Sequence, residues 1–519
     1  MPKVHNSSCI LVSLCSALLF LLPGVALGQI TNVNDTTSTP IPGAGHDYIK
    51  MLNETVNPAN GSVSVRIHVP MPKGRGLTLP FSFDYDSNSV NILRALGYAS
   101  ASWVANSSFL SQGGWGYSVP IANLQGGSRS YTDPNTHHTY TCNYWTDYMF
   151  QDPTGGRHAL GIGYAQQGGD CLHVPNYPVD GPHQGGDDLF SAYTPGGWLS
   201  VAGSDGTAYY WSSFGGGLLR SHLPDYIEDV NGNRVTVQDS GGGAFTFTDT
   251  LGRAAISSNG FGPSGQTNTI TFSNLSYQIT WRTISSVVFT VPSTRINVDP
   301  AIGCQPFPNV NTPQTVVHSI TLPNNQQYTF YYGDDNPDLT LHNPFGLLSE
   351  IIYPSGGWIK YTWQLAGTSG EYEVVSYPGT TNIGQIMPGG CQYRYSVPMV
   401  ATRQVSFNGG AQPDLVKSFS YDPVVWSGSG WTTKVTRVTT TDNIRNQSFK
   451  TVYTYTPVAG PPTPPNEISW VANQIAVESK IDYCDWGATT YSSANSLRTV
   501  KKSWSDPYDM TCEQVAQSR

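Results

Sequence analysis

The sequence predicts an all-β protein built from many short strands. Short runs that alternate apolar and polar side chains recur from Tyr48 onward, and this alternation is typical of strands with one buried face. The 54 Gly and 37 Pro residues cluster between these runs, where such residues end strands and form turns. Charged residues make up only 12% of the chain, about half the usual share. Apolar residues at helical spacing are nearly absent, so we expect strands and turns almost throughout.

Residues 1–28 form a predicted secretory signal peptide. Lys3 precedes a largely apolar run from Ile10 to Leu22, and the small-residue site Ala26-Leu27-Gly28 follows. This run has 13 residues, whereas a membrane-spanning helix needs about 20 apolar residues, and no later segment approaches that length. The sequence therefore predicts an exported protein, secreted or on the cell surface, with no membrane span.

Six cysteines remain after removal of the signal peptide, which contains Cys9 and Cys15. They are Cys142, Cys171, Cys304, Cys391, Cys484 and Cys512. An even number in an oxidising compartment favours disulfides, and six cysteines allow 15 sets of pairs. Pairing of neighbours (Cys142 with Cys171, Cys304 with Cys391, Cys484 with Cys512) is the simplest set. No CxxC motif and no closely spaced Cys/His set occurs, so we expect no structural zinc site. No cofactor is predicted.

Composition divides the mature chain into five predicted segments. The segments are a linker (29–47), an N-terminal β region with an irregular insert (48–214), a steadier array of strands and turns that resemble repeats (215–456), a Pro-rich linker or loop (457–466) and a C-terminal β segment (467–519), which could be a truncated array.

The clearest predicted strand covers residues 62–69. Alternate residues from Val63 to Val69 would share one face, and Asn60-Gly61 just before them is a tight-turn signal. The same alternation predicts further strands at 77–83, 234–237, 269–272, 328–332, 358–363 and 434–438.

A strand-and-turn phrase recurs in the middle of the chain. Asp229-Val230-Asn231-Gly232 and Asp249-Thr250-Leu251-Gly252-Arg253 begin 20 residues apart, a spacing that suits a repeated hairpin. An Asp side chain accepts hydrogen bonds from backbone N–H groups two residues on, and Gly adopts positive φ at no steric cost. Each Asp-x-x-Gly phrase is therefore predicted to close a hairpin.

These phrases resemble the repeats of the Rhs/YD-repeat family, which includes shell-forming bacterial Rhs proteins and the teneurin ectodomain. The family's repeat is an aromatic strand that ends in Tyr or Phe and Asp, followed by a turn with Gly and often Arg. Matching phrases are Phe83-Asp84-Tyr85-Asp86, Phe247-Thr248-Asp249, Phe330-Tyr331-Tyr332-Gly333-Asp334 and Phe419-Ser420-Tyr421-Asp422. The opening block, from Val56-Asn57-Pro58 through Gly74-Arg75-Gly76 to Tyr85-Asp86, is similar to the entry region of such proteins.

The resemblance covers residues 48–97 and 218–455. It implies strands wound into a curled or spiral, hollow β shell with no catalysis of its own. The resemblance leaves the partner open, and the candidates are a toxin or other polypeptide cargo, or cell-surface glycans. Few units carry the complete Gly-Arg ending and their period is irregular, so we expect an irregular version of the shell.

The phrase that begins at Asp229 also invites a calcium interpretation. Asp229, Asn231 and Asn233 alternate oxygen ligands as a calcium loop does. An EF-hand loop, however, needs Gly at its sixth position and a carboxylate at its twelfth. Here Gly232 is fourth and Ser240 is twelfth, so the turn interpretation is favoured over calcium.

A pair of adjacent histidines invites a second metal interpretation. His137-His138 lies between Asp133 and Cys142. Adjacent residues on a strand point to opposite faces, so the two imidazoles would rarely bind one ion there. A solvated loop is therefore favoured over a metal site.

A further hypothesis concerns acid/base chemistry. His173, His183, Asp187 and Asp188 lie in a Gly- and Pro-rich stretch and could gather acid/base groups. No nucleophile elbow, zinc-protease motif or phosphate-binding loop occurs in the sequence. Absence of these motifs does not exclude a glycosidase, and the prediction that the protein is not an enzyme rests on the resemblance. No metal site is predicted.

The predicted function is structural: a secreted or cell-surface scaffold, carrier or interaction module. The alternative is an extracellular carbohydrate-binding or glycoside-hydrolysing β protein. The 13 Trp and 30 Tyr residues could line a sugar groove, and a glycosidase needs only two carboxylates paired in space. A net charge of −9 with no basic block argues against a nucleic-acid partner.

Overall fold

The computed structural model describes most residues between Asn53 and Trp504. Gaps of four or more residues in this range fall at 71–76, 96–100, 166–169, 174–182, 215–218, 298–309, 366–372, 381–385, 388–391, 460–470 and 488–491. The predicted signal peptide and linker, Asp188, Cys304, Cys391 and Cys512 lie outside the described residues.

The prediction of an all-β protein is confirmed. Strands dominate the described part of the chain, whose helical elements are the short 3-10 turns η1 (Ser87–Ser89), η2 (Cys171–His173), η3 (Leu339–Leu341) and η4 (Ser493–Asn495). No described helix is long and apolar enough to cross a membrane.

The largest sheet, named the wall sheet, has 21 described strands that pair antiparallel in chain order. Its strands are β13 (Gln184–Gly186), β14 (Phe190–Tyr193), β15 (Leu199–Gly203), β16 (Ala208–Trp211), β18 (Tyr226–Glu228), β19 (Arg234–Gly241), β20 (Ala244–Thr248), β21 (Ala254–Asn259), β22 (Thr267–Phe272), β23 (Leu275–Ile284), β27 (Gln314–Thr321), β28 (Gln327–Tyr332), β29 (Leu348–Ile352), β30 (Trp358–Leu365), β35 (Pro398–Ser406), β36 (Leu415–Tyr421), β37 (Val425–Ser427), β38 (Gly430–Asp442), β39 (Gln447–Ala459), β41 (Gln474–Cys484) and β42 (Ser496–Lys501).

A second sheet, named the N-terminal sheet, has six described strands. In spatial order they are β1 (Glu54–Val56), β2 (Val63–Val69), β3 (Phe81–Asp86), β8 (Trp115–Tyr117), β7 (Ser111–Gln112) and β6 (Ser107–Ser108). The alternation predicted for residues 62–69 appears in β2, whose residues Val63, Val65, Ile67 and Val69 are all buried.

A third sheet, named the arm sheet, is built on a long hairpin. Its described strands are β11 (Arg157–Ala159), β10 (Thr139–Gln151), β9 (Ile121–Thr132) and β17 (Leu219–His222), with β12 (Tyr164–Ala165) also paired to β10. The smaller described sheets are β4 (Asn91–Ala95) with β5 (Ala101–Ala105), β24 (Val288–Phe289) with β26 (Val310–Asn311), β32 (Gly379–Thr380) with β33 (Ile386–Met387), and the four strands β25 (Ser293–Asn297), β34 (Gln392–Tyr395), β31 (Glu373–Ser376) and β40 (Val471–Ala472).

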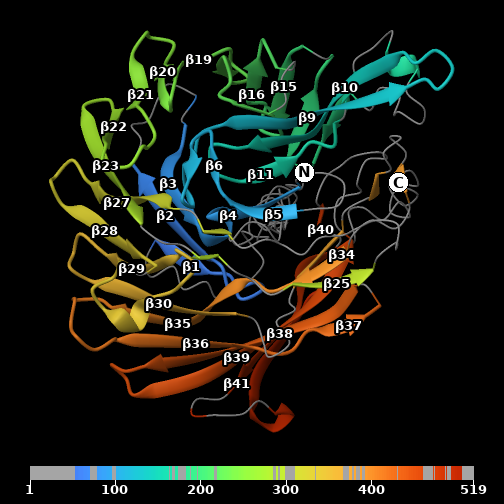
Figure 1. The fold of residues 1–519 in the computed structure, drawn as a ribbon. Helices are drawn as coiled ribbons and strands as arrows, with labels where there is room; N and C mark the ends of the chain where they lie inside the picture. Colours follow the sequence, from blue (N-terminus) through green and yellow to red (C-terminus); the bar gives the residue numbers. More distant parts are fainter. Residues whose placement is uncertain are drawn as a thin grey trace, which may run out of the picture.

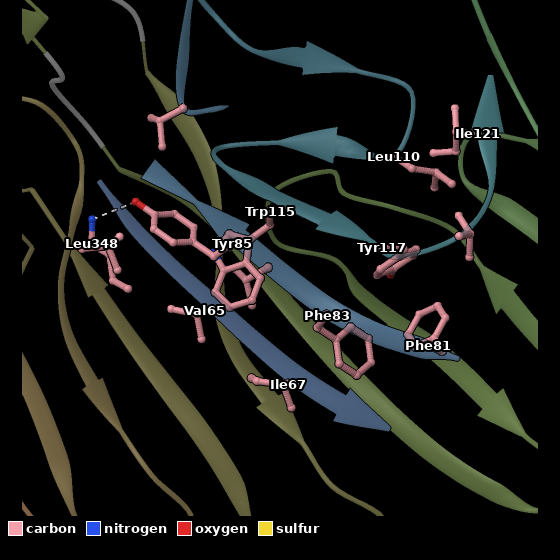
Figure 2. Packing of buried hydrophobic residues seen from close by; sticks show 14 of the residues in the cluster. Val65, Ile67, Phe81, Phe83, Tyr85, Leu110, Trp115, Tyr117, Ile121 and Leu348 are labelled. Carbon is pink, nitrogen blue, oxygen red and sulfur yellow. Dashed lines mark hydrogen bonds between the residues drawn. The ribbon is translucent and has the colours of Figure 1, made fainter. Parts of the chain in front are cut away.

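The wall sheet curves around the N-terminal sheet (Figure 1), and the two share one hydrophobic core. Phe81 packs against Phe272 of β22 at 4.8 Å between ring centroids, and Trp115 packs against Phe330 of β28 at 4.7 Å. Figure 2 shows the aromatic side chains of β3 and β8 in this core, with the Tyr85 hydroxyl accepting a hydrogen bond from the Leu348 N–H at 3.1 Å. The N-terminal sheet therefore occupies the concave side of the wall.

The wall sheet spans two of the predicted segment boundaries. β16 pairs with β18 across the predicted boundary between residues 214 and 215. β39 continues to Ala459, inside the predicted linker at 457–466. The segment limits themselves stay predictions.

Candidate functional site

One turn geometry closes six hairpins of the described chain. In each, the first residue's N–H donates to the carbonyl of the fifth residue, and the fourth residue's N–H donates back to the carbonyl of the first. The turns are Asp152–Gly156, Gly203–Thr207, Asp229–Asn233, Asp249–Arg253, Leu322–Gln326 and Tyr353–Gly357. The fourth residue has positive φ in every case, as a three-residue hairpin loop requires.

The predicted turn residues Asp229, Gly232, Asp249, Gly252 and Arg253 take part in two of these turns. Asp229 Oδ1 accepts hydrogen bonds from two backbone N–H groups of its own turn, at 2.8 and 2.9 Å. Asp249 does the same, and its Oδ2 also accepts from the Arg253 guanidinium at 2.7 Å. These carboxylates stabilise the turns, as the turn interpretation predicts.

The predicted acid/base residues separate into two places. His173, on η2, stacks on Tyr140 at 4.3 Å with a 6° angle between the ring planes. The disulfide between Cys142 and Cys171 holds η2 beside the hairpin of β9 and β10, which we name the arm. This predicted disulfide is confirmed. His183 Nδ1 contacts the Thr194 carbonyl at 2.9 Å.

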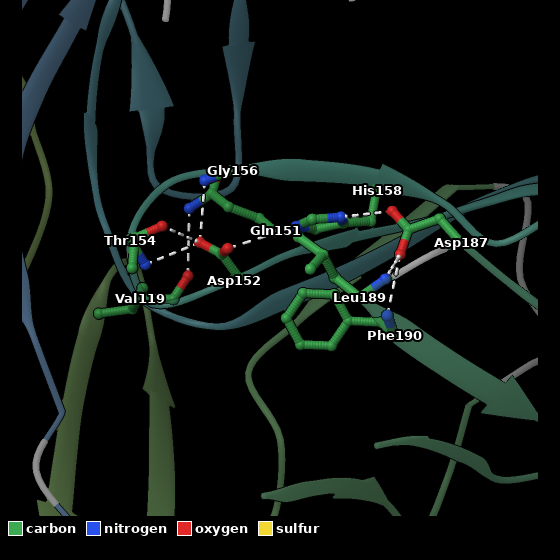
Figure 3. A network of polar contacts seen from close by, with 9 residues as sticks. All are labelled: Val119, Gln151, Asp152, Thr154, Gly156, His158, Asp187, Leu189 and Phe190. Carbon is green, nitrogen blue, oxygen red and sulfur yellow. Dashed lines mark hydrogen bonds and ion pairs between the residues drawn. The ribbon is translucent and has the colours of Figure 1, made fainter. Parts of the chain in front are cut away.

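Asp187 instead contacts His158, which was not among the predicted site residues. Its Oδ2 lies 2.6 Å from His158 Nδ1, while Asp152 Oδ2 lies 3.3 Å from His158 Nε2 (Figure 3). His158 is 3% exposed. We name this trio the histidine clamp.

Each carboxylate of the histidine clamp also stabilises its own hairpin. Asp152 Oδ1 accepts hydrogen bonds from the N–H groups of Thr154 and Gly156. Asp187 Oδ1 accepts from the N–H groups of Leu189 and Phe190, both at 2.9 Å. The clamp therefore ties the β10–β11 turn of the arm sheet to the β13–β14 turn of the wall sheet.

The electrostatics of the histidine clamp favour a charged imidazole. Burial alone would lower the pKa of His158, but hydrogen bonds to Asp152 and Asp187 outweigh burial and raise the pKa to about 9. Burial raises the pKa of each carboxyl, but the hydrogen bonds from His158 and from the turn N–H groups outweigh it and hold both pKa values below the usual range. At neutral pH both ring nitrogens carry protons and donate them, so the ring has no lone pair for a base or a metal ligand.

A second buried charge pair joins the N-terminal sheet to the wall. Arg403 Nε of β35 donates to Glu54 Oε1 of β1 at 2.9 Å, and the Tyr361 hydroxyl of β30 donates to Glu54 Oε2 at 2.7 Å. Burial opposes the charge on Arg403, but Glu54 outweighs burial and raises the pKa of the guanidinium. Glu54 and Arg403 are 4% and 6% exposed, so this pair fixes β1 and has no access for a substrate.

The alternative function requires aromatic rings with open faces. One aromatic row beside the first strands of the wall sheet consists of Tyr193, Trp198, Tyr210 and Tyr226, with neighbouring ring centroids 5.0 to 5.6 Å apart. Tyr210 and Tyr226 stack on each other, and the Arg234 guanidinium lies 4.0 Å from the Tyr226 ring centroid. Tyr210 and Tyr226 form a cross-strand pair of the kind that stabilises a sheet, whereas Tyr193 is 40% exposed.

Among the described residues, no group of three or more His, Cys, Asp or Glu side chains is arranged to hold a metal ion. His137, at φ 55°, and His138 lie at the exposed tip of the arm, where His138 packs edge-on against Tyr140 at 4.6 Å. Asp133 accepts hydrogen bonds from the backbone of that tip.

Sequence reasoning missed His158, Asp152, Glu54 and Arg403. Asp152-Pro153-Thr154-Gly155 carries the same Asp-x-x-Gly signal as Asp229 and Asp249, so the turn at Asp152 could have been predicted. The other three residues have no local signal, because their partners lie far away in the sequence. Cys484 is buried at the end of β41, and its predicted partner lies outside the described residues.

The chain has no match among protein-family models and none among curated protein sequences.

Proposed function

We propose that this protein is an exported structural scaffold, carrier or interaction module that resembles the shell segment of Rhs/YD-repeat proteins. The observation that carries the proposal is the wall sheet, which follows chain order from β13 to β42 among the described strands and curves around the N-terminal sheet. A continuous ladder of hairpins builds a surface, and each hairpin stabilises its neighbours.

The buried polar groups described above bind one another within the fold, and this supports a structural role. The histidine clamp and the Glu54–Arg403 pair each join two sheets, and their charges are satisfied within the fold. Such groups stabilise and specify a fold and are not available for proton transfer to a substrate. A toxin or other polypeptide cargo would share the concave side of the wall with the N-terminal sheet, whereas glycans would bind from outside.

The disulfide supports export, since disulfides form and persist in oxidising compartments. The test is expression of the full chain with a C-terminal epitope tag in a secretion-competent host, followed by fractionation and protease treatment of intact cells. The proposal expects the tag in the medium or at the protease-accessible surface. Retention inside the cell would overturn the exported role.

The catalytic alternative needs a separate assay. Purified protein is incubated with a panel of polysaccharides, and new reducing ends are measured. The structural proposal expects none above the level of a heat-denatured sample, and sustained release of reducing ends would replace it with the glycosidase alternative.

A further inference from the structure

A lysine, an asparagine and a glutamate meet where the loop between β28 and β29 folds over the wall sheet. Glu350 on β29 lies directly opposite Lys360 on β30 in the strand register. Asn336, from the loop, is 2% exposed and Glu350 is 7% exposed. The Lys360 side chain is 21% exposed.

The two oxygens of the Glu350 carboxylate contact different partners. Oε2 accepts a hydrogen bond from Asn336 Nδ2 at 2.9 Å, and Oε1 lies 3.8 Å from Lys360 Nζ. The Asn336 Oδ1 atom accepts from the backbone N–H of Asp338 at 2.8 Å. One carboxylate therefore links an amine to a carboxamide whose carbonyl is polarised by a backbone donor.

We propose that Lys360 and Asn336 become joined by an isopeptide bond. Glu350 takes a proton from the Lys360 ammonium, and the neutral amine attacks Asn336 Cγ. The Cγ–Nδ2 bond breaks as the new C–N bond forms. Two protons pass in all from the lysine nitrogen through Glu350 to the departing nitrogen, which leaves as ammonium, and Glu350 ends as it began.

The surroundings favour this step over hydrolysis. The backbone N–H of Asp338 stabilises negative charge on Oδ1 during the attack, as an oxyanion-hole donor does. Burial of Asn336 and Glu350 keeps water away from Cγ. The reaction needs no oxidant, reductant or cofactor, since ammonium is the only product released.

The competing interpretation is an ordinary ion pair. Lys360 Nζ also lies 3.4 Å from Asp338 Oδ2 and 4.8 Å from the centroid of the Trp358 ring. In that case the same contacts persist without a covalent bond. Peptide mass spectrometry separates the two, because only the bond produces a branched peptide.

The experiment digests the full exported chain with trypsin and chymotrypsin and analyses the peptides by tandem mass spectrometry. No Lys or Arg lies between Arg295 and Lys360, so chymotrypsin, which cleaves after residues such as Phe345, is needed to separate Asn336 from Lys360. The bond then predicts a branched peptide that links Asn336 to Lys360, lighter by one ammonia than its two parts, with no tryptic cleavage after Lys360. Intact mass alone does not decide, because an N-terminal Gln29 also loses ammonia when it cyclises.

Three variants test the proposed roles of Lys360 as the nucleophile and Glu350 as the proton carrier. Lys360→Arg keeps the charge but removes the nucleophile, and Glu350→Gln keeps the shape but removes the proton carrier, so both are expected to lose the branched peptide. Lys480→Arg, at a lysine paired with Asp482 at 2.7 Å, is expected to retain it. Fully linear peptides from the folded wild-type protein would overturn the proposal, and a branched peptide that survives Glu350→Gln would overturn the role of Glu350.

Discussion

A single backbone angle distinguishes the fourth residue of each repeated turn. Gly155, Gly206, Gly232, Gly252 and Gly356 have φ between 74° and 87°, and Asn325 fills the same place with φ 64°. Asn is the non-glycine residue that tolerates this region best. The turns therefore depend on local backbone energy, which a substitution can measure directly.

Gly252→Ala is expected to lower the free energy of unfolding by about 1 kcal/mol, because alanine is strained at positive φ. An added Cβ at Gly252 meets no atom within 4 Å, so the loss isolates backbone strain from steric clash. Gly197→Ala is the control, since its Cβ also meets nothing and its φ lies outside the positive region. Urea unfolding curves measure both, and equal stabilities would contradict the argument.

The histidine clamp predicts a pH dependence. The pKa of His158 is raised to about 9 from 6.5 in the unfolded chain, so its contribution is complete below pH 6.5 and is lost as the pH rises toward 9. The loss is on the order of 3 kcal/mol. On the acid side, the lowered pKa values of Asp152 and Asp187 mean that their contribution is lost as the pH falls below the usual carboxyl range.

His158→Gln is expected to flatten the fall in unfolding free energy between pH 6.5 and 9. His138→Gln, at an exposed histidine on the arm tip, controls for loss of an imidazole. Denaturant unfolding at several pH values measures the slope. An unchanged slope in His158→Gln would show that other groups produce the dependence.

Among the elements, the arm, which is the hairpin of β9 and β10, is paired with neighbouring strands over only part of its length. β9 and β10 pair over their whole length, but β17 contacts β9 only from Ala122 to Gln125. Beyond that point the arm is largely a two-stranded ribbon, which is marginally stable alone. The disulfide and the stack of Tyr140 on His173 hold η2 against it.

Replacing both Cys142 and Cys171 with Ser is expected to make the arm open locally before the rest of the protein unfolds. The disulfide joins residues 29 positions apart and so constrains the unfolded arm, which means that its loss favours opening. Limited proteolysis followed by peptide mapping would then find faster cleavage between residues 126 and 173. Wild-type protein treated with reductant should show the same pattern, and unchanged cleavage would contradict the role of the disulfide.

At the scale of the whole molecule, the wall sheet and the N-terminal sheet depend on each other. Trp115 is 2% exposed and donates a hydrogen bond from Nε1 to the Tyr332 hydroxyl at 2.6 Å. Because each sheet buries its apolar face against the other, neither face is protected alone. The two sheets should unfold together.

Trp115→Ala is expected to lower the free energy of unfolding by about 3–5 kcal/mol while keeping a single transition. Trp198→Ala, in the partly exposed aromatic row, is the control and should cost less. Urea unfolding is followed by circular dichroism, which reports strand content, and by near-ultraviolet absorbance, which reports the burial of aromatic rings in both sheets. Separate transitions for the two sheets in the wild-type protein would contradict a shared core.

Much of the local structure could be predicted from the sequence. The alternation from Val63 to Val69 identifies β2 and its buried face, and the Asp-x-x-Gly phrases identify hairpin turns. The disulfide between Cys142 and Cys171 follows from the simplest pairing. The candidate sites could not be predicted in this way, since residues such as Glu54 and Arg403, which form one ion pair, stand 349 residues apart in the sequence.

The all-β class and the turns could be predicted from the sequence alone, because alternation and turn chemistry act within a few residues. The packing of the sheets decided that the N-terminal sheet occupies the concave side of the wall. It also decided that His158 bridges two carboxylates and that Glu350 contacts both Lys360 and Asn336. These arrangements depend on which faces are buried together, and that packing joins residues whose separation along the chain carries no signal.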